Sequence, residues 1–129
     1  MQLTATYSVE RNTHKLSKRP NVLLDEEKVE IILNTIASYS NVPRYLIISP
    51  TRKREICELR FIAMEIIKKN TSMMLMPIGN VFNGRDHSSV IHAINKVNDL
   101  FEMDKKFKEK YLSIQHELSS KFILHKARY

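Results

Sequence analysis

Residues 83–96 read NGRDHSSVIHAINK, and they join a turn signal to the start of a helix. Asn83 and Gly84 both adopt a left-handed backbone at low cost, and Gly84 is one of only 2 glycines in the chain. Asp86 follows as a residue type that caps helices. The apolar residues after it recur at helical spacing: Val90, Ala93, Ile94, Val97 and Phe101. The stretch predicts a sharp turn and then a helix.

The segment ahead of this turn completes a helix-turn-helix pattern. Residues 73–82 are short and apolar, so two helices flank a turn that contains glycine. In DNA-binding proteins with this motif, the second helix enters the major groove with its N-terminus first. Residues 85–89 would then bring short polar groups to base edges and phosphates. Capping and solvation explain the same residues without DNA, because polar residues crowd the starts of many helices.

The rest of the chain is helical in pattern and predicts an all-α fold. Helices are indicated over residues 25–38, over 51–70, and at the C-terminal end, where five apolar residues keep a 3-4 spacing: Phe107, Tyr111, Ile114, Leu118 and Phe122. A short apolar turn at 45–48 is closed by Ser49-Pro50. No segment alternates as a strand does. We therefore expect about six helices, with the helix-turn-helix spanning residues 73–101.

The 129 residues suffice for one domain with a core. Residues 1–24 are polar and without period, and their basic residues predict a flexible arm. Residues 25–124 form the expected domain with its C-terminal helix, and 125–129 form a tail. The methionine start and the arm favour a stand-alone protein over a fragment.

The charge balance predicts an anionic partner. Lys and Arg number 21 against 14 Asp and Glu, which gives a net charge of +7. Nucleic acid, an anionic membrane surface and an acidic protein all fit this charge. No apolar run approaches the roughly 18 residues needed to span a bilayer, so no transmembrane helix is expected. Of these anionic partners, we expect DNA and no membrane. The single cysteine, Cys57, cannot form an internal disulfide, which favours the reducing cytoplasm.

The sequence contains no arrangement of residues that is typical of a catalytic or metal-binding site. Asp86, His87 and Ser88 are the residue types of a hydrolase triad, but consecutive helical residues point about 100 degrees apart and cannot line up. No pair of the metal-binding candidates has metal-ligand spacing: Cys57, His14, His87, His92, His116 and His125. No phosphate-binding G-x-x-x-x-G-K-[ST] stretch is present. We expect no enzyme activity, no cofactor, no metal and no nucleotide.

The residue identities around the turn resemble the signature of the C-terminal DNA-binding domain of the bacterial replication initiator DnaA. That signature runs I-G-x-x-F-G-G-R-D-H-T-T-V-x-H-A-x-x-K-I. It is matched here by Ile78-Gly79, Phe82, residues 84–90, His92-Ala93 and Lys96. The upstream basic loop and R-x-x-A-M helix of the family are matched by residues 52–54 and 60–64.

The resemblance covers residues 25–124 and implies a Trp-repressor-like, all-helical architecture that binds double-stranded DNA at A/T-rich sites like the DnaA box. It implies base contacts by Asp86, His87 and Ser88 in the major groove and by Arg52 in the minor groove. It also implies contacts along the DNA backbone by a second set: Arg54, Arg60, Lys68, Leu75, Arg85 and Ser89. For Arg54 and Lys68, a solvated helix face is an equally simple explanation.

Three departures from the family pattern lie in the turn and at the start of the helix that follows it. Asn83 replaces the first glycine of the pair, and Ser88 and Ser89 replace two threonines, so methyl groups that can pack on thymine are lost. The ATP-binding motor of the initiators has no counterpart here. The process served is therefore open: replication initiation at an origin, transcriptional regulation, or a mobile element.

A second class of function is a helical protein-interaction module with only non-specific DNA binding. In this alternative, residues 103–124 pair with another copy or another protein through Tyr111, Ile114, Leu118 and Phe122. The methionines Met73, Met74 and Met76 are expected to fill the core.

Overall fold

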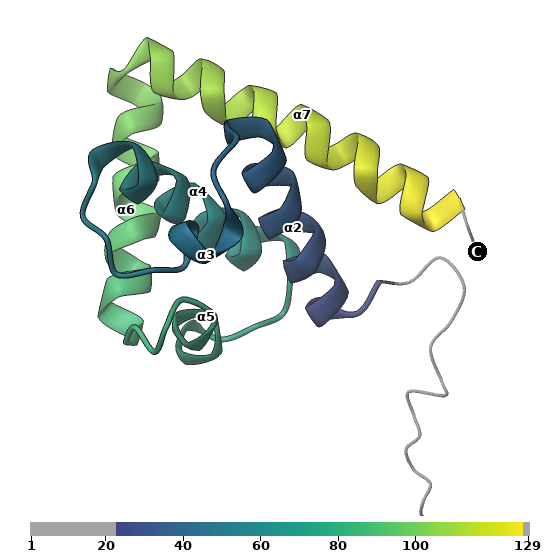
Figure 1. Cartoon of the computed structure of the whole chain (residues 1–129), viewed down its shortest axis with the longest axis horizontal. Coiled ribbons are helices and arrows are strands. Elements are labelled where there is room, and N and C mark those ends of the chain that lie inside the picture. Colours follow the sequence, from purple (N-terminus) through teal and green to yellow (C-terminus); the bar gives the residue numbers. More distant parts are fainter. Residues whose placement is uncertain (1–22, 128–129) are drawn as a thin grey trace, which may run out of the picture.

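The computed structural model describes residues 23–127, with side chains described up to residue 122. Within this range there are six helices and no strand: α2 (Asp25–Ser40), α3 (Arg44–Ile47), α4 (Arg54–Asn70), α5 (Leu75–Val81), α6 (His87–Met103) and α7 (Lys105–Ala127) (Figure 1). The predicted all-α fold is confirmed. The predicted arm falls almost entirely outside the described residues, as does the end of the predicted tail.

Both ends of helix α2 are set by nearby residues. Three acidic residues occupy its first turn, where they favour the positive end of the helix dipole, and the Glu27 carboxylate accepts from the Leu24 backbone N–H at 2.9 Å. At its end, Asn41 takes a left-handed conformation with φ of 62°. The helix runs two residues beyond the predicted end at residue 38.

Helix α4 begins at Arg54, so the predicted start at residue 51 was wrong. Lys53 is not helical, with ψ of 130°, and its backbone N–H donates to the Thr51 hydroxyl at 3.4 Å. Such local side-chain bonds compete with helix formation. Residues 50–53 therefore form an exposed connector, hereafter the basic loop, which carries Arg52 and Lys53.

Helix α4 is the central element of the core, in contact with α2, α3, α5 and α6 (Figure 1). Ile62, Ala63, Ile66 and Ile67 are fully buried along it. The sequence pattern predicted one apolar face, with Arg60 and Glu65 on the other side. Both are buried instead, at 2% and 8% exposure, because neighbouring helices cover α4 on more than one side.

Helix α7 packs against α2 and α6 through the residues predicted to pair with another copy. Tyr111, Ile114 and Leu118 are at most 4% exposed, and Phe122 is partly buried against the same core. This face is occupied within the domain. Dimerisation through it, as the second class of function supposed, would require α7 to detach.

A polar contact joins α7 to the buried side of α4. The Tyr111 hydroxyl donates to Glu65 Oε1 at 2.7 Å, and Lys69 Nζ donates to the Tyr111 oxygen at 3.0 Å. Burial, together with the hydrogen bond to Glu65 and its negative charge, raises the pKa of the Tyr111 hydroxyl above its ordinary value. The buried carboxylate is thus partnered, as burial of a charge requires.

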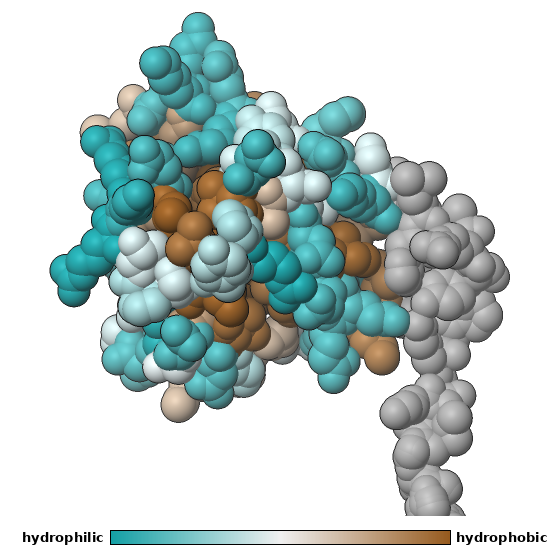
Figure 2. All heavy atoms as spheres, viewed as in Figure 1, coloured by the Kyte–Doolittle hydropathy of each residue, from teal (hydrophilic) through white to brown (hydrophobic). Residues whose placement is uncertain are grey.

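Two methionines around the start of α5 are exposed, although the sequence predicted them in the core. Met74 and Met76 are 71% and 60% exposed, so the expectation that they fill the core was wrong, whereas Met73 packs against the core. Figure 2 shows one face of the molecule, on which hydrophilic residues surround hydrophobic ones that remain visible near its centre. Among residues 23–127, no helix is both long and apolar enough to cross a bilayer.

We expect Tyr111→Phe to lower the free energy of unfolding at pH 7 by about 1–3 kcal/mol, because the Glu65 carboxylate loses its buried donor. The raised pKa means that the tyrosine ionises first in the unfolded chain, near pH 10. The stability contributed by its protonated hydroxyl is therefore complete below that pH and is lost as the pH rises above it.

Urea unfolding followed by circular dichroism at pH 7 and above pH 10 measures both effects, and the difference between the two proteins should shrink at the higher pH. Tyr45→Phe is the matched control, because Tyr45 is 69% exposed and should tolerate the change. Equal stability of Tyr111→Phe and the parent at pH 7 would contradict this assignment.

Candidate nucleic-acid interface

The turn between α5 and α6 has two consecutive residues in the left-handed region. Asn83 has φ of 69° and Gly84 has φ of 76°. A side chain with a Cβ is strained there, and asparagine and glycine carry the smallest penalty. The predicted roles of both residues in the turn are confirmed, and Asn83 adopts the left-handed conformation that was expected of it.

Gly79 has a separate role that the sequence pattern did not indicate. The Arg85 backbone N–H donates to the Gly79 carbonyl oxygen at 3.0 Å, so the turn folds back on α5. A Cβ at position 79 would lie 2.9 Å from the Arg85 carbonyl carbon and would overlap its oxygen. Only glycine permits this approach of two backbones. The contact holds the start of α6 against α5.

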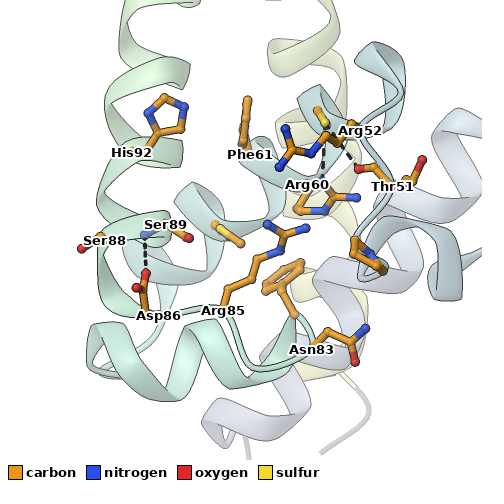
Figure 3. A pocket seen from close by; sticks show the side chains of 14 residues that line it. Thr51, Arg52, Arg60, Phe61, Asn83, Arg85, Asp86, Ser88, Ser89 and His92 are labelled. Carbon is orange, nitrogen blue, oxygen red and sulfur yellow. Dashed lines mark hydrogen bonds between the residues drawn. The ribbon is translucent and has the colours of Figure 1, made fainter.

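Asp86 caps α6, as the sequence predicted. Its Oδ1 accepts from the Ser89 backbone N–H at 3.0 Å, and α6 begins at His87 (Figure 3). This hydrogen bond lowers the pKa of the Asp86 carboxyl below its ordinary value. His87 and Ser88 are exposed in the first turn, and Ser89 is partly exposed. The first turn of α6 is therefore open to a ligand.

A hollow of about 920 Å³ separates the basic loop from the first turns of α6. Arg52 lines it from the loop, while Asp86, Ser88 and Ser89 line it from the opposite side (Figure 3). His87 is not among the lining residues, although it is exposed beside them. The structure thus brings Arg52 and two of the three residues predicted to read the major groove to the edges of one hollow.

The remaining residues expected at the DNA backbone lie in different environments. Arg54 is 83% exposed and pairs with Glu58 at 3.5 Å, within the same helix. Lys68 is exposed, and its Nζ donates to the Met73 carbonyl at 3.5 Å. Leu75 begins α5 and packs partly against the core. None of these three lines the hollow.

Arg60 differs from the other residues predicted at the DNA backbone, because it is buried. Its side chain is buried, its Nε donates to the Ile47 carbonyl at 2.9 Å, and its Nη1 contacts Cys57 Sγ at 3.5 Å. Burial, and then the positive charge of Arg85, lower the pKa of its guanidinium. The side chain lines the hollow but is only 2% exposed, so the predicted backbone contact would require a phosphate to enter the hollow.

His92 lies in the wall of the hollow, which its position in the sequence did not indicate. Its ring meets the ring of Phe61 from α4 edge to face, with centroids 5.7 Å apart, and both residues line the hollow. The sequence reading treated His92 as a scaffold position. Among the described residues, no group of three or more His, Cys, Asp or Glu side chains could hold a metal ion.

Comparison with known protein families identifies a match. The family model for the bacterial DnaA protein helix-turn-helix matches residues 29–97, which is more than half of the chain. The matched span contains α3, α4 and α5, most of α2, and α6 as far as Val97, and it includes every residue that lines the hollow. Helix α7 lies outside it.

The capping role of Asp86 can be tested without DNA, by comparing the thermal stability of two variants. Asp86→Asn should leave the melting temperature near that of the parent, because asparagine caps helices equally well, whereas Asp86→Ala should lower it. The pKa of the Asp86 carboxyl is lower in the folded protein than in the unfolded chain. The stability that the ionised cap contributes is therefore complete above about pH 4, and it is lost as the pH falls further. Thermal melts at pH 7 and pH 3 measure this, and an unchanged melting temperature for Asp86→Ala at pH 7 would contradict the cap.

Proposed function

The chain belongs to the bacterial DnaA helix-turn-helix family and is a DNA-binding protein, and we propose that it recognises a specific double-stranded sequence with α6 in the major groove and the basic loop in the adjacent minor groove. The observation that carries the proposal is the hollow between these two elements. Adjacent grooves are divided by one sugar-phosphate strand. A loop and a helix that face each other across a hollow suit a protein that straddles such a strand.

The side chains at the start of α6 have the chemistry needed for base reading. A carboxylate such as Asp86 accepts from the amino group of cytosine, and a serine hydroxyl such as that of Ser88 donates or accepts. His87 is exposed at the leading end of the helix, where base edges are reached first. We assign base contacts in the major groove to these three residues and a minor-groove contact to Arg52.

Contacts to the DNA backbone are assigned to Arg54, Lys68 and Ser89, with Leu75 at the groove edge. Both cations are exposed, and the net charge of the chain is +7, so a salt-dependent background of phosphate binding is expected. Arg60 is left out because it is buried. Arg85 is left out because it is only partly exposed and its guanidinium already donates to Ser49.

The target proposed is an A/T-rich site similar to the DnaA box. Because Ser88 and Ser89 lack the methyl groups of the family's threonines, discrimination at the thymines they meet should be weaker. We propose a role in replication control or transcriptional regulation, in the bacterial cytoplasm on the nucleoid. In this role the protein needs neither catalysis nor a nucleotide.

Selection from a library of random duplexes tests the proposal directly. The expected outcome is one enriched motif, rich in A and T, that the protein also binds more tightly than unselected duplexes at the same salt concentration. Enrichment of no motif would exclude sequence-specific recognition, and the chain would then bind DNA through its charge alone.

The division between base and backbone contacts predicts different behaviour for two substitutions. His87→Ala should cost about 1–3 kcal/mol on the selected duplex and little on random duplexes. Lys68→Ala should weaken binding to all duplexes alike and reduce the salt slope by about one. Titrations on both duplexes at several salt concentrations distinguish them, and equal losses for His87→Ala on both duplexes would overturn its assignment as a reader.

A further inference from the structure

Two arginines from different parts of the chain donate to carbonyl groups at the end of α3. Arg60, from the middle of α4, donates through Nε to the Ile47 carbonyl at 2.9 Å. Arg85, from the turn before α6, donates through Nη2 to the Ser49 carbonyl at 3.2 Å. We call this pair the arginine clamp. In Figure 3 both side chains point into the space between the basic loop and α6.

The clamp is an electrostatically costly arrangement. Arg60 is 2% exposed, and among the described residues neither arginine forms an ion pair with a carboxylate. The two positive charges also lie close enough that Arg85 lowers the pKa of Arg60. A buried cation without a carboxylate partner usually destabilises a fold. Stability alone therefore does not account for two arginines here, and the groups that they hold suggest another role.

The carbonyl groups that the clamp holds lie immediately before the basic loop. Ser49 is followed by Pro50, whose ring fixes its own φ, and then by Thr51 and Arg52. The Cys57 thiol contacts the Thr51 carbonyl at 3.6 Å, which ties the loop to α4 as well. Bonds from Arg85 and from α4 thus hold the segment that carries Arg52.

Arg85 connects this segment to the recognition helix directly. It immediately precedes Asp86, and its backbone is held against Gly79 of α5. A single residue thus fixes the start of α6 through its backbone and the start of the basic loop through its side chain. The guanidinium fork suits this role, because it presents several donors in a rigid plane.

We propose that Arg85, supported by Arg60, is a positioning residue that sets the separation between Arg52 and the base-reading turn of α6. The proposal rests on the proposed function, because it concerns how the two reading elements act together. It differs from the role that the family resemblance implied for both arginines, which was contact with the DNA backbone. With the clamp intact, the loop is held where Arg52 reaches the minor groove while α6 occupies the major groove.

A direct phosphate contact is the competing explanation. Arg85 Nε and Arg60 Nη2 are buried and have no hydrogen-bond partner among the described residues, and both arginines line the hollow. A phosphate that entered the hollow would meet these donors. The two explanations differ in one measurable respect: a phosphate contact acts independently of Arg52, whereas a positioning residue acts through it.

A double-mutant cycle on the selected duplex distinguishes them. In the parent protein, Arg52→Ala should weaken binding by about tenfold, the loss of one good base contact. In the Arg85→Met background the same change should cost less than about threefold, because the loop is no longer held in place. Arg85→Met alone should leave the salt slope unchanged. Lys68→Ala is the matched control, and its effect should add to that of Arg52→Ala.

Additive losses for Arg85→Met and Arg52→Ala, with a salt slope reduced by about one, would overturn positioning in favour of a phosphate contact. Failure of the proposed function has a different signature, in which no motif is selected or Arg52→Ala has no effect in the parent.

A thermal melt establishes that Arg85→Met folds. If it does not, Arg85→Lys replaces it in the cycle, since it keeps the charge but loses the planar fork. Positioning then predicts a smaller cost of Arg52→Ala, and an unchanged cost would overturn it.

Discussion

The close approach of the α5 and α6 backbones at Gly79 is the constraint on which the rest of the interface depends. The Arg85 peptide sits where a side chain at position 79 would be, and two left-handed residues bring the chain there. From this contact α6 departs in a fixed direction, with Asp86 as its cap. The polar groups in the first turn of α6 are held facing solvent, because the turn at Asn83 and Gly84 cannot change its conformation without displacing α5.

Helix α4 supplies the frame on which this motif is mounted. It contacts α2, α3, α5 and α6, and its polar residues Arg60 and Glu65 are buried where it meets α3 and α7. Each has hydrogen bonds that reach another element, to Ile47 on one side and to Tyr111 on the other. The frame is thus held by directional bonds as well as by apolar packing, which fixes the positions of α3 and α7 relative to it.

Helix α7 lies outside the residues that the DnaA family model matches, 29–97. Its apolar residues pack against α2 and α6, and none of its residues lines the hollow, so they serve the core of this chain. Apolar spacing indicated that this helix would be amphipathic. It could not indicate whether the partner of the apolar face would be another copy or the same domain, because both bury the same residues.

The sequence by itself determined the local features: the left-handed turn, the cap at Asp86 and the helix types, since each depends on residues within a few positions of one another. It also indicated the family, through residue identities in two blocks, 52–64 and 78–96. The tertiary structure alone decided which basic residues face solvent. Arg54 is exposed and Arg60 is buried, although both lie on one helix six positions apart, because burial depends on which elements cover each side. It likewise brought Arg52 and Asp86 to opposite edges of one hollow, through contacts between segments more than 30 residues apart that no local pattern encodes.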